Sequence, residues 1–162
     1  MSSVPRTSVR PDGRHTDLAD VAPRLAAAQA AFQQVAYPGR IDLVTRELVR
    51  ILSGRLAHCN VCRNLRLNAA VKRGFEESMT AHLEDPEHAA DLTDRQRAAL
   101  VLANAFFDDP AGYPAGARRE LVELFEPDEL AELVLDLIRF RPGSKLAVAS
   151  GTEPVTDELI YQ

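Results

Sequence analysis

Apolar residues recur at intervals of three and four along most of this chain, which is the period of amphipathic helices. The first such segment is rich in alanine and stops before Tyr37-Pro38-Gly39. A second helix is expected to begin at Asp42 and to bury one continuous apolar face. A third should run from Cys59 to Gly74, because glycine commonly ends helices, and a short one should follow over residues 75–83.

The second half of the chain has the same helical character. Thr93 and Gln96 match a capping box, and the run that follows is apolar on nearly every side, so we expect this helix to be the most buried. Pro114 suits the first turn of the next helix. No segment reads as a confident strand and no internal repeat is visible. The pattern therefore predicts a compact all-α fold with short connections.

The last long helix is expected to open at Pro127 and to break or kink at Pro142, where an interior proline removes a hydrogen bond. Its apolar residues at helical spacing predict the side that faces the core. This predicted stripe consists of Leu130, Leu133, Val134, Leu137 and Ile138.

Composition adds the domain organisation and excludes several partners. Residues 1–16 are rich in Ser, Arg and Pro and are interpreted as a flexible tail, and residues 17–162 as a single helical domain. With 46% hydrophobic and 27% charged residues, the chain has ordinary globular composition. Its net charge of -5 gives no reason to expect nucleic acid or an anionic membrane as partner.

The sequence also indicates where the protein works. We see no apolar run near the ~20 residues that span a bilayer. The first residues lack the apolar core of a secretory signal. We therefore expect a cytoplasmic protein without a membrane partner.

Candidate chemistry centres on the two cysteines, Cys59 and Cys62. Two are too few for a disulfide framework, and a C-x-x-C pair in a reducing compartment suggests redox chemistry. At a helix start, free backbone amides and the helix dipole stabilise a thiolate. Arg63 and Arg66 each follow a cysteine by four residues and should lower a thiol pKa further. A thiolate so activated can attack a peroxide or disulfide, and its neighbour can then close an internal disulfide.

Two other interpretations of the pair stay open. Free cysteines are commonly buried as small apolar residues. A metal site using His58 and both cysteines would need a fourth ligand, and the arginines oppose a cation. Glu47 lies twelve positions before Cys59, at the edge of an apolar stripe. From periodicity alone it is a partly exposed helix carboxylate, paired with Arg46 or Arg50.

The pattern that runs from Glu47 to Cys59-Asn-Val-Cys62 resembles the alkyl hydroperoxide reductase D (AhpD) and carboxymuconolactone decarboxylase superfamily. That family carries a glutamate, eleven intervening residues and then C-x-x-C. The likeness continues over residues 92–100 and weakly over 128–149. It implies an all-helical fold with the redox pair in a small pocket, in homotrimers or larger assemblies.

The resemblance also implies roles for individual residues. Cys62 would attack the hydroperoxide, Cys59 would resolve it as a disulfide, and Glu47 would belong to a proton relay. Reasoning from the helix start alone favours Cys59 instead, as the more exposed and readier thiolate. This chain has Arg66 and Val61 where the peroxidase branch typically has relay histidines. Arginine can stabilise a thiolate but cannot shuttle protons at neutral pH.

The sequence therefore predicts a thiol-dependent oxidoreductase that reduces hydroperoxides, with Cys59, Cys62, Glu47 and Arg66 as catalytic residues. It should need a dithiol or protein thiol reductant, and no cofactor or metal. We expect a homo-oligomer built from trimers or dimers, with the alanine-rich first helix allowing close approach. The alternatives are a non-catalytic binding or redox-sensing member of the family, or a lactone decarboxylase-type enzyme. The decarboxylase branch generally lacks the cysteine pair, although Arg66 could bind a carboxylate.

Overall fold

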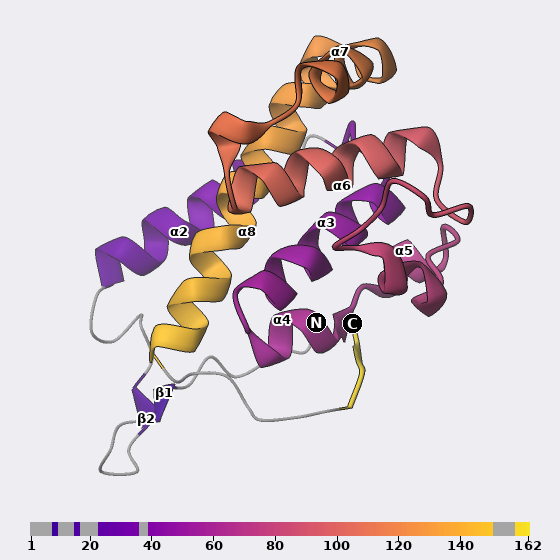
Figure 1. Ribbon diagram of the computed structural model, residues 1–162. Helices are drawn as coiled ribbons and strands as arrows, with labels where there is room; N and C mark the ends of the chain where they lie inside the picture. Colours follow the sequence, from indigo (N-terminus) through magenta and orange to yellow (C-terminus); the bar gives the residue numbers. More distant parts are fainter. Residues whose placement is uncertain (1–7, 10–14, 17–22, 36–38, 151–157) are drawn as a thin grey trace.

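The computed structural model describes residues 8–9, 15–16, 23–35, 39–150 and 158–162 (Figure 1). Most of the predicted tail, residues 1–16, lies outside the described residues. Within it, β1 (Ser8–Val9) and β2 (His15–Thr16) pair as a short antiparallel ladder. The remaining described elements are helical apart from two strands near the cysteines, so the all-α fold class is confirmed.

Helix α3 (Leu43–Leu56) is the central element of the fold. Asp42 caps it, because its side chain accepts a hydrogen bond from the Thr45 amide at 2.8 Å. Helices α4 (Asn60–Asn64), α6 (Asp94–Phe107) and α8 (Pro127–Ser150) all pack against α3. Ten residues of α3 are buried, compared with five residues of α6. The expectation that the α6 segment is the most buried helix was therefore wrong. Contact on several sides buries α3, and apolar composition alone does not reveal this.

The second half of the chain follows the local signals closely. The Thr93 and Gln96 capping box is present at the start of α6. The 3-10 turns η1 (Glu77–His82) and η2 (Pro110–Gly112) flank α6, and α7 (Ala115–Leu124) leads into α8. Helix α8 continues through Pro142 instead of ending there. Buried residues on both sides of the proline, Arg139 and Ser144, show that tertiary packing extends across it.

The inner face of α8 differs from the predicted apolar stripe. Leu133 and Leu137 are fully buried, but Val134 and Ile138 are 37% and 43% exposed. Charged residues of α8 are buried instead, because Arg46 of α3 forms ion pairs with carboxylates on α8. We call this group the buried ionic cluster, and it consists of Arg46, Glu132, Asp136 and Arg139.

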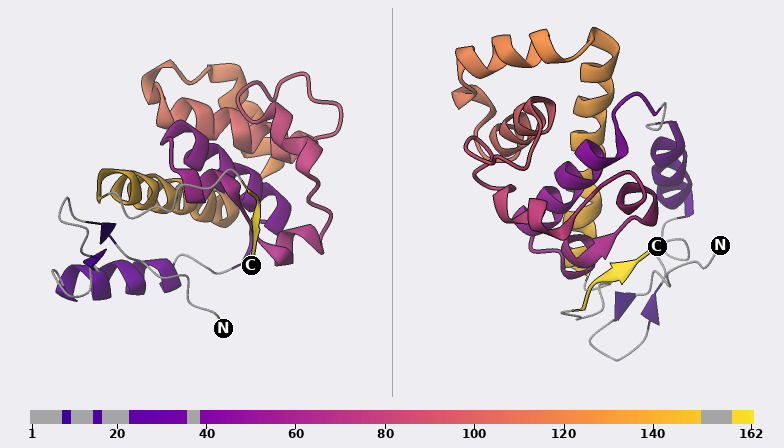
Figure 2. Two further views of the ribbon diagram at one scale, coloured as in Figure 1. Left: turned by 90° about the horizontal axis from the view of Figure 1, so that it is seen from below. Right: turned by 90° about the vertical axis from the view of Figure 1, so that its right-hand side faces the viewer.

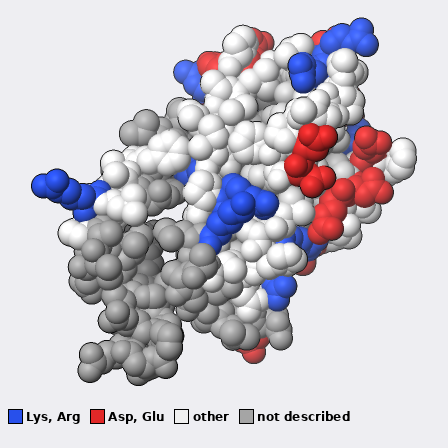
Figure 3. Space-filling view, turned by 60° about the vertical axis from the view of Figure 1, so that its left-hand side comes forward, with Lys and Arg blue, Asp and Glu red and all other residues white. Residues whose placement is uncertain are grey.

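The predicted first helix is present as α2 (Pro23–Val35), at the periphery of the molecule (Figure 2). Its Leu25 is 57% exposed, and most of its alanines face solvent. Figure 3 shows a large uncharged area on one face of the molecule, with basic side chains near its centre and a group of acidic side chains to its right. Over the described ranges, no helix is both long enough and apolar enough to cross a bilayer.

The helix predicted over residues 59–74 is broken into two. Helix α4 ends at Asn64, the strand β3 (Leu65–Arg66) follows, and α5 (Asn68–Val71) resumes. Strand β3 pairs in parallel with β4 (Ile160–Tyr161) at the other end of the chain. The expectation of no strands was therefore wrong at this point, because the pairing partner lies about ninety residues away and leaves no local signal.

Candidate redox site

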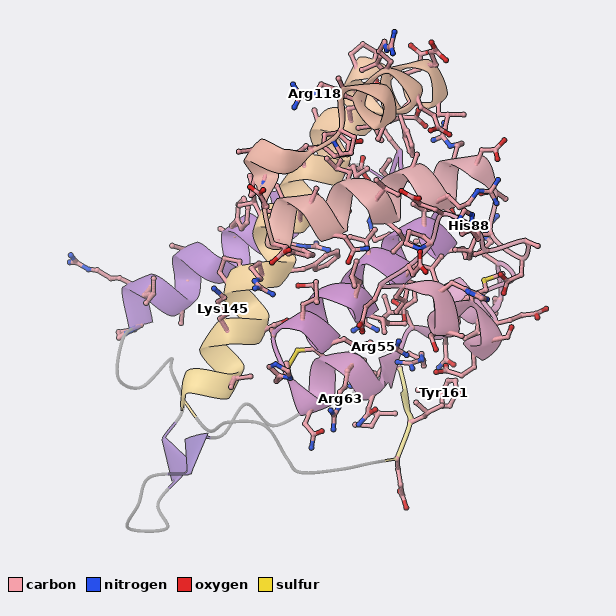
Figure 4. The ribbon with its side chains drawn as sticks, in the orientation of Figure 1. Arg55, Arg63, His88, Arg118, Lys145 and Tyr161 are labelled. Atoms are coloured by element: carbon pink, nitrogen blue, oxygen red, sulfur yellow. A yellow bond between two sulfur atoms is a disulfide. The ribbon has the colours of Figure 1, made fainter. Side chains whose placement is uncertain are left out.

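Cys59 and Cys62 are joined by a disulfide at the turn between α3 and α4, with their Cα atoms 5.3 Å apart (Figure 4). Cys59 caps α4, and its Sγ accepts a hydrogen bond from the Cys62 amide at 3.3 Å. The predicted position of the pair at a helix start is therefore confirmed. Cys59 is 0% exposed while Cys62 is partly exposed, so the expectation that Cys59 is the more exposed cysteine was wrong.

The main chain brings α4 very close to α3, and Gly54 permits this approach. His58 takes the left-handed conformation at φ 54°, and the Cys59 amide turns back to donate to the Gly54 carbonyl at 2.9 Å. A Cβ on Gly54 would lie 2.8 Å from the backbone of Cys62 and Arg63. Sequence reasoning missed Gly54. The available signal was a glycine inside a helix, where it costs stability unless something requires it.

Glu47 is fully buried, which corrects its interpretation as a partly exposed carboxylate. Its Oε1 accepts hydrogen bonds from Arg50 Nη2 at 2.8 Å and from the Leu67 amide at 2.9 Å. Its Oε2 accepts from Arg50 Nε at 2.9 Å. Among the described residues, no hydrogen bond joins Glu47 to either sulfur. The predicted pairing with Arg50 is confirmed.

Arg50 connects this carboxylate to the main chain around the cysteines. Its Nη1 donates to the Cys62 carbonyl at 2.9 Å, and its Nη2 also donates to the Leu65 carbonyl. Sequence reasoning gave Arg50 no functional role. Its signal was a position three residues after Glu47, on the same side of a helix that leads to the cysteines.

Arg66 is also buried, but it does not lie one helical turn from Cys62, because α4 ends at Asn64. Its Nε and Nη2 donate to Glu77 at 2.6 and 2.5 Å. Its Nη1 donates to the carbonyls of Arg63 and Leu65 at 2.6 and 2.9 Å. The hydrogen bond from Arg66 holds the pKa of Glu77 below its usual value, against the opposing effect of partial burial.

Two guanidinium groups thus hold the C-terminal end of α4, where a helix normally leaves carbonyls without partners. Arg50 donates to the Cys62 carbonyl and Arg66 donates to the Arg63 carbonyl. Both guanidinium groups also donate to the Leu65 carbonyl. Arg63, which points outward in Figure 4, donates to Asn60 Oδ1 at 2.5 Å. Each of the two guanidinium groups is anchored by its own glutamate, so the peptide after the redox pair is fixed from two sides.

The metal interpretation finds no support in this geometry. The two sulfurs are bonded to each other, and His58 is exposed. Within the part of the chain that the structure describes, no group of three His, Cys, Asp or Glu side chains is placed to hold a metal ion. The arrangement can close and reopen a disulfide at a partly exposed helix start.

Solved structures share this fold. A protein of unknown function from Agrobacterium tumefaciens, ATU0492, a candidate antioxidant defence protein AhpD, superposes with a TM-score of 0.71 and 18% identity over 87% of this chain and 98% of its own. A variant of the debrominase Bmp8 in complex with 2,3,4-tribromopyrrole superposes with a TM-score of 0.70 and 13% identity, over 96% of this chain and 93% of its own. Apo Bmp8 superposes with a TM-score of 0.68 and 15% identity, over 85% of this chain and 74% of its own. The chain therefore has the AhpD-like fold, as its resemblance to the superfamily implied.

Sequence comparison adds relatives but no activity. No family model matches the chain. The uncharacterized proteins Rv2313c and MT2376, from two strains of Mycobacterium tuberculosis, are each 33% identical over 113 residues. This alignment covers 70% of the chain and only 39% of each relative. The part of the chain that aligns thus spans less than half the length of these relatives.

Proposed function

We propose that the protein is a thiol-dependent oxidoreductase that reduces hydroperoxides through Cys59 and Cys62. The observation that carries this proposal is the disulfide at the start of α4, in which one sulfur belongs to a buried residue and the other to a partly exposed one. A reversible reaction needs one accessible thiolate and a second thiol within bonding reach. The shared fold with a candidate antioxidant protein supports the same class of reaction.

The reaction divides into three balanced steps. The Cys62 thiolate attacks the outer oxygen of ROOH, and the O–O bond breaks to give a Cys62 sulfenic acid and, after protonation, ROH. The Cys59 thiol then displaces water from that sulfenic acid and forms the disulfide. An external dithiol or protein thiol reduces the disulfide and is itself oxidised to a disulfide. A reducing compartment such as the cytoplasm would supply this reductant.

The exposure of the two cysteines supports Cys62 as the attacking residue. A hydroperoxide can approach a partly exposed sulfur, whereas Cys59 is fully buried in the disulfide form. Cys59 is well placed to resolve the intermediate, since its Sγ already lies against the Cys62 amide. Glu47 and Arg66 act here through the main chain that follows the pair, because their described contacts lie there.

Peroxide consumption with a dithiol donor tests this function. With the dithiol present we expect turnover by the wild-type protein and complete loss in Cys62→Ser. In reduced Cys59→Ser from which the dithiol has been removed, one equivalent of peroxide should be consumed and the reaction should stop at a sulfenic acid, because no second thiol is available to condense with it. A sulfenic acid-specific alkylating probe, read by mass spectrometry, identifies that intermediate. If the disulfide opens and closes but peroxide is not consumed, the redox-sensing alternative is correct instead.

We also propose that the protein works as a homo-oligomer. Val134, Leu135 and Ile138 are exposed along one side of α8, and α2 exposes Leu25 and several alanines. Apolar surface of this kind is typical of contacts between subunits. A stable interface should bury more than roughly 1,000 Å². Light scattering at micromolar concentration is the direct test, and a monomer there contradicts the proposal. If the protein is an oligomer, Ile138→Glu should shift it toward smaller species, because the charge would lie in the apolar contact.

A further inference from the structure

The Glu47 and Arg50 side chains form an ion pair that contacts the main chain of the redox pair at Cys62. Glu47 is 0% exposed and the Arg50 side chain is 11% exposed, so both charges are largely removed from water. Two hydrogen bonds of 2.8 and 2.9 Å join them. The pair is close to neutral as a whole, but its positive member is the one that contacts the residue carrying the accessible sulfur.

That contact is to the main chain of Cys62. Arg50 Nη1 donates to the Cys62 carbonyl at 2.9 Å, and the same guanidinium reaches the Leu65 carbonyl. A positive charge near a thiol favours its charged form, and the charge of a largely buried guanidinium is only weakly screened by water. The guanidinium also fixes the orientation of the helix that carries Cys62.

The contacts of Glu47 speak against direct proton exchange with the cysteines. A general base must lie within hydrogen-bond reach of the proton that it removes. Both oxygens of Glu47 are occupied by Arg50 and by the Leu67 amide. In the described part of the chain neither sulfur is among its partners. The proton of Cys62 can instead leave to water, because Cys62 is partly exposed.

We propose that Arg50 is a positioning residue for the redox pair, which holds the Cys62 main chain and favours its thiolate, and that Glu47 acts through Arg50 rather than as a proton carrier. This proposal rests on the proposed redox function of the cysteines. It changes the role that the family resemblance implies for Glu47. It also names a residue at a position where that resemblance implied none.

The two members of the pair should shift the thiol pKa in opposite directions. Arg50→Met leaves the buried Glu47 carboxylate uncompensated near Cys62, so the pKa of the Cys62 thiol should rise by about one unit. Glu47→Gln keeps the shape of the side chain and leaves Arg50 uncompensated, so the same pKa should fall. A residue that serves only folding would not give opposite signs.

The measurement uses Cys59→Ser protein, in which Cys62 is the remaining thiol. Thiolate absorbance in the ultraviolet and the rate of alkylation by iodoacetamide are followed as pH is varied. Arg50→Met alone places an unpaired charge in the interior and could fail to fold. The double variant Glu47→Gln/Arg50→Met removes both charges, and its thiol pKa should return toward the value of the parent protein.

Arg66→Met is the matched control. Arg66 is also a buried guanidinium paired with a glutamate, but it contacts the carbonyls of Arg63 and Leu65 and not that of Cys62. Its replacement should lower stability and change the thiol pKa much less than Arg50→Met does. An equal shift in the two variants would mean that the effect is general loosening of this region.

The proposal is overturned if Glu47→Gln and Arg50→Met move the thiol pKa in the same direction, or if neither moves it. Where Arg50→Met does not fold, it is overturned if the double variant keeps the full shift of Glu47→Gln. It is also overturned if Glu47→Gln leaves the thiol pKa unchanged and slows the reaction with peroxide, since a proton carrier behaves in this way. None of the titrations requires peroxide turnover. Opposite pKa shifts without peroxide consumption would therefore contradict the proposed function and leave the role of Arg50 supported.

Discussion

Arg46 and Glu47 are neighbours on α3, both are buried, and they hold two different parts of the molecule. Arg46 reaches the side chains of Glu132 and Asp136 on α8 and joins two long helices. Glu47 anchors Arg50, which reaches main-chain carbonyls after Cys59–Cys62. The first contact links side chain to side chain, and the second links a side chain to the backbone of the redox pair.

This difference separates the charges that build the scaffold from those that adjust the site. Burial is costly for the ionic cluster on α8, and desolvation raises the pKa of Asp136 above its usual value although Arg46 and Arg139 oppose this. Such a cluster holds two helices in register at a cost in free energy. The Glu47 and Arg50 pair instead satisfies main-chain carbonyls at the end of the short helix α4, where a helix leaves carbonyls without intrahelical partners. Mutations in the buried ionic cluster should therefore mainly affect stability, and mutations around the redox pair should also affect the reactivity of the cysteines.

The largest effect on stability is expected on the α8 side. Arg46→Met removes the guanidinium that pairs with the buried carboxylates of Glu132 and Asp136, and leaves Asp136 with Arg139 alone. The free energy of unfolding, measured by urea denaturation, should fall by about 3–5 kcal/mol. Thiol reactivity in the folded fraction should stay near that of the wild type, because Arg46 faces α8.

The exposed ion pair between Arg40 and Asp128 provides the control for this experiment. Because both side chains are more than half exposed, Arg40→Met should change the free energy of unfolding by less than about 1 kcal/mol. Equal losses in Arg46→Met and Arg40→Met would show that burial of the ionic cluster is unimportant.

On the redox side, the close approach of α4 to α3 should be the most sensitive feature. Gly54→Ala places a Cβ 2.8 Å from the backbone of Cys62 and Arg63, which cannot move as a flexible side chain would. We expect a loss of about 1–3 kcal/mol in the free energy of unfolding. Disulfide formation should also slow, since α4 must shift away from α3.

Gly116→Ala is the matched substitution, because Gly116 lies inside α7 with open space around its Cβ position. There alanine should be neutral or stabilising by up to about 1 kcal/mol. Thiol quenching followed by mass spectrometry measures the rate of disulfide closure in both variants. If Gly54→Ala closes its disulfide as fast as Gly116→Ala, the tight contact does not position the pair.

The sequence predicted those features that depend on neighbouring residues. Caps at Asp42 and Thr93 start helices where expected, because their hydrogen-bond partners lie three residues away. The cysteine pair was also predicted at a helix start, and Cys59 caps α4. The break after Asn64 was not, because it depends on pairing with β4. The charged inner face of α8 was also missed, because it requires Arg46 from a distant helix.

The candidate site shows the same division. The pairing of Glu47 with Arg50 follows from their spacing, but their burial follows from the fold around them. Arg66 was placed beside a sulfur because one continuous helix was assumed, and in the structure it binds Glu77. Chemistry that arises within one or two turns can thus be predicted from the sequence, while the direction in which a long side chain points cannot.

The smallest effect is expected at the second guanidinium that holds the end of α4. The Glu77 side chain is 44% exposed, so solvent screening limits its pair with Arg66 to less than about 1 kcal/mol. Glu77→Gln should lose this amount near neutral pH. The hydrogen bond from Arg66 lowers the pKa of Glu77 in the folded protein, so the folded state binds this proton less tightly than the unfolded state does.

The contribution of Glu77 to the free energy of unfolding is therefore fully present above the pKa of the unfolded state, which is about 4.3 for glutamate. It is lost as the pH falls through the lowered pKa of the folded state. Urea denaturation of the wild type and Glu77→Gln at a series of pH values measures the difference directly. The two stability curves should converge in acid and separate toward neutral pH. Because Arg66 does not contact the Cys62 carbonyl, the thiol pKa should stay nearly constant in Glu77→Gln. A thiol shift as large as that of Glu47→Gln would show that both guanidinium groups act on the redox pair, and the distinction between them would be lost.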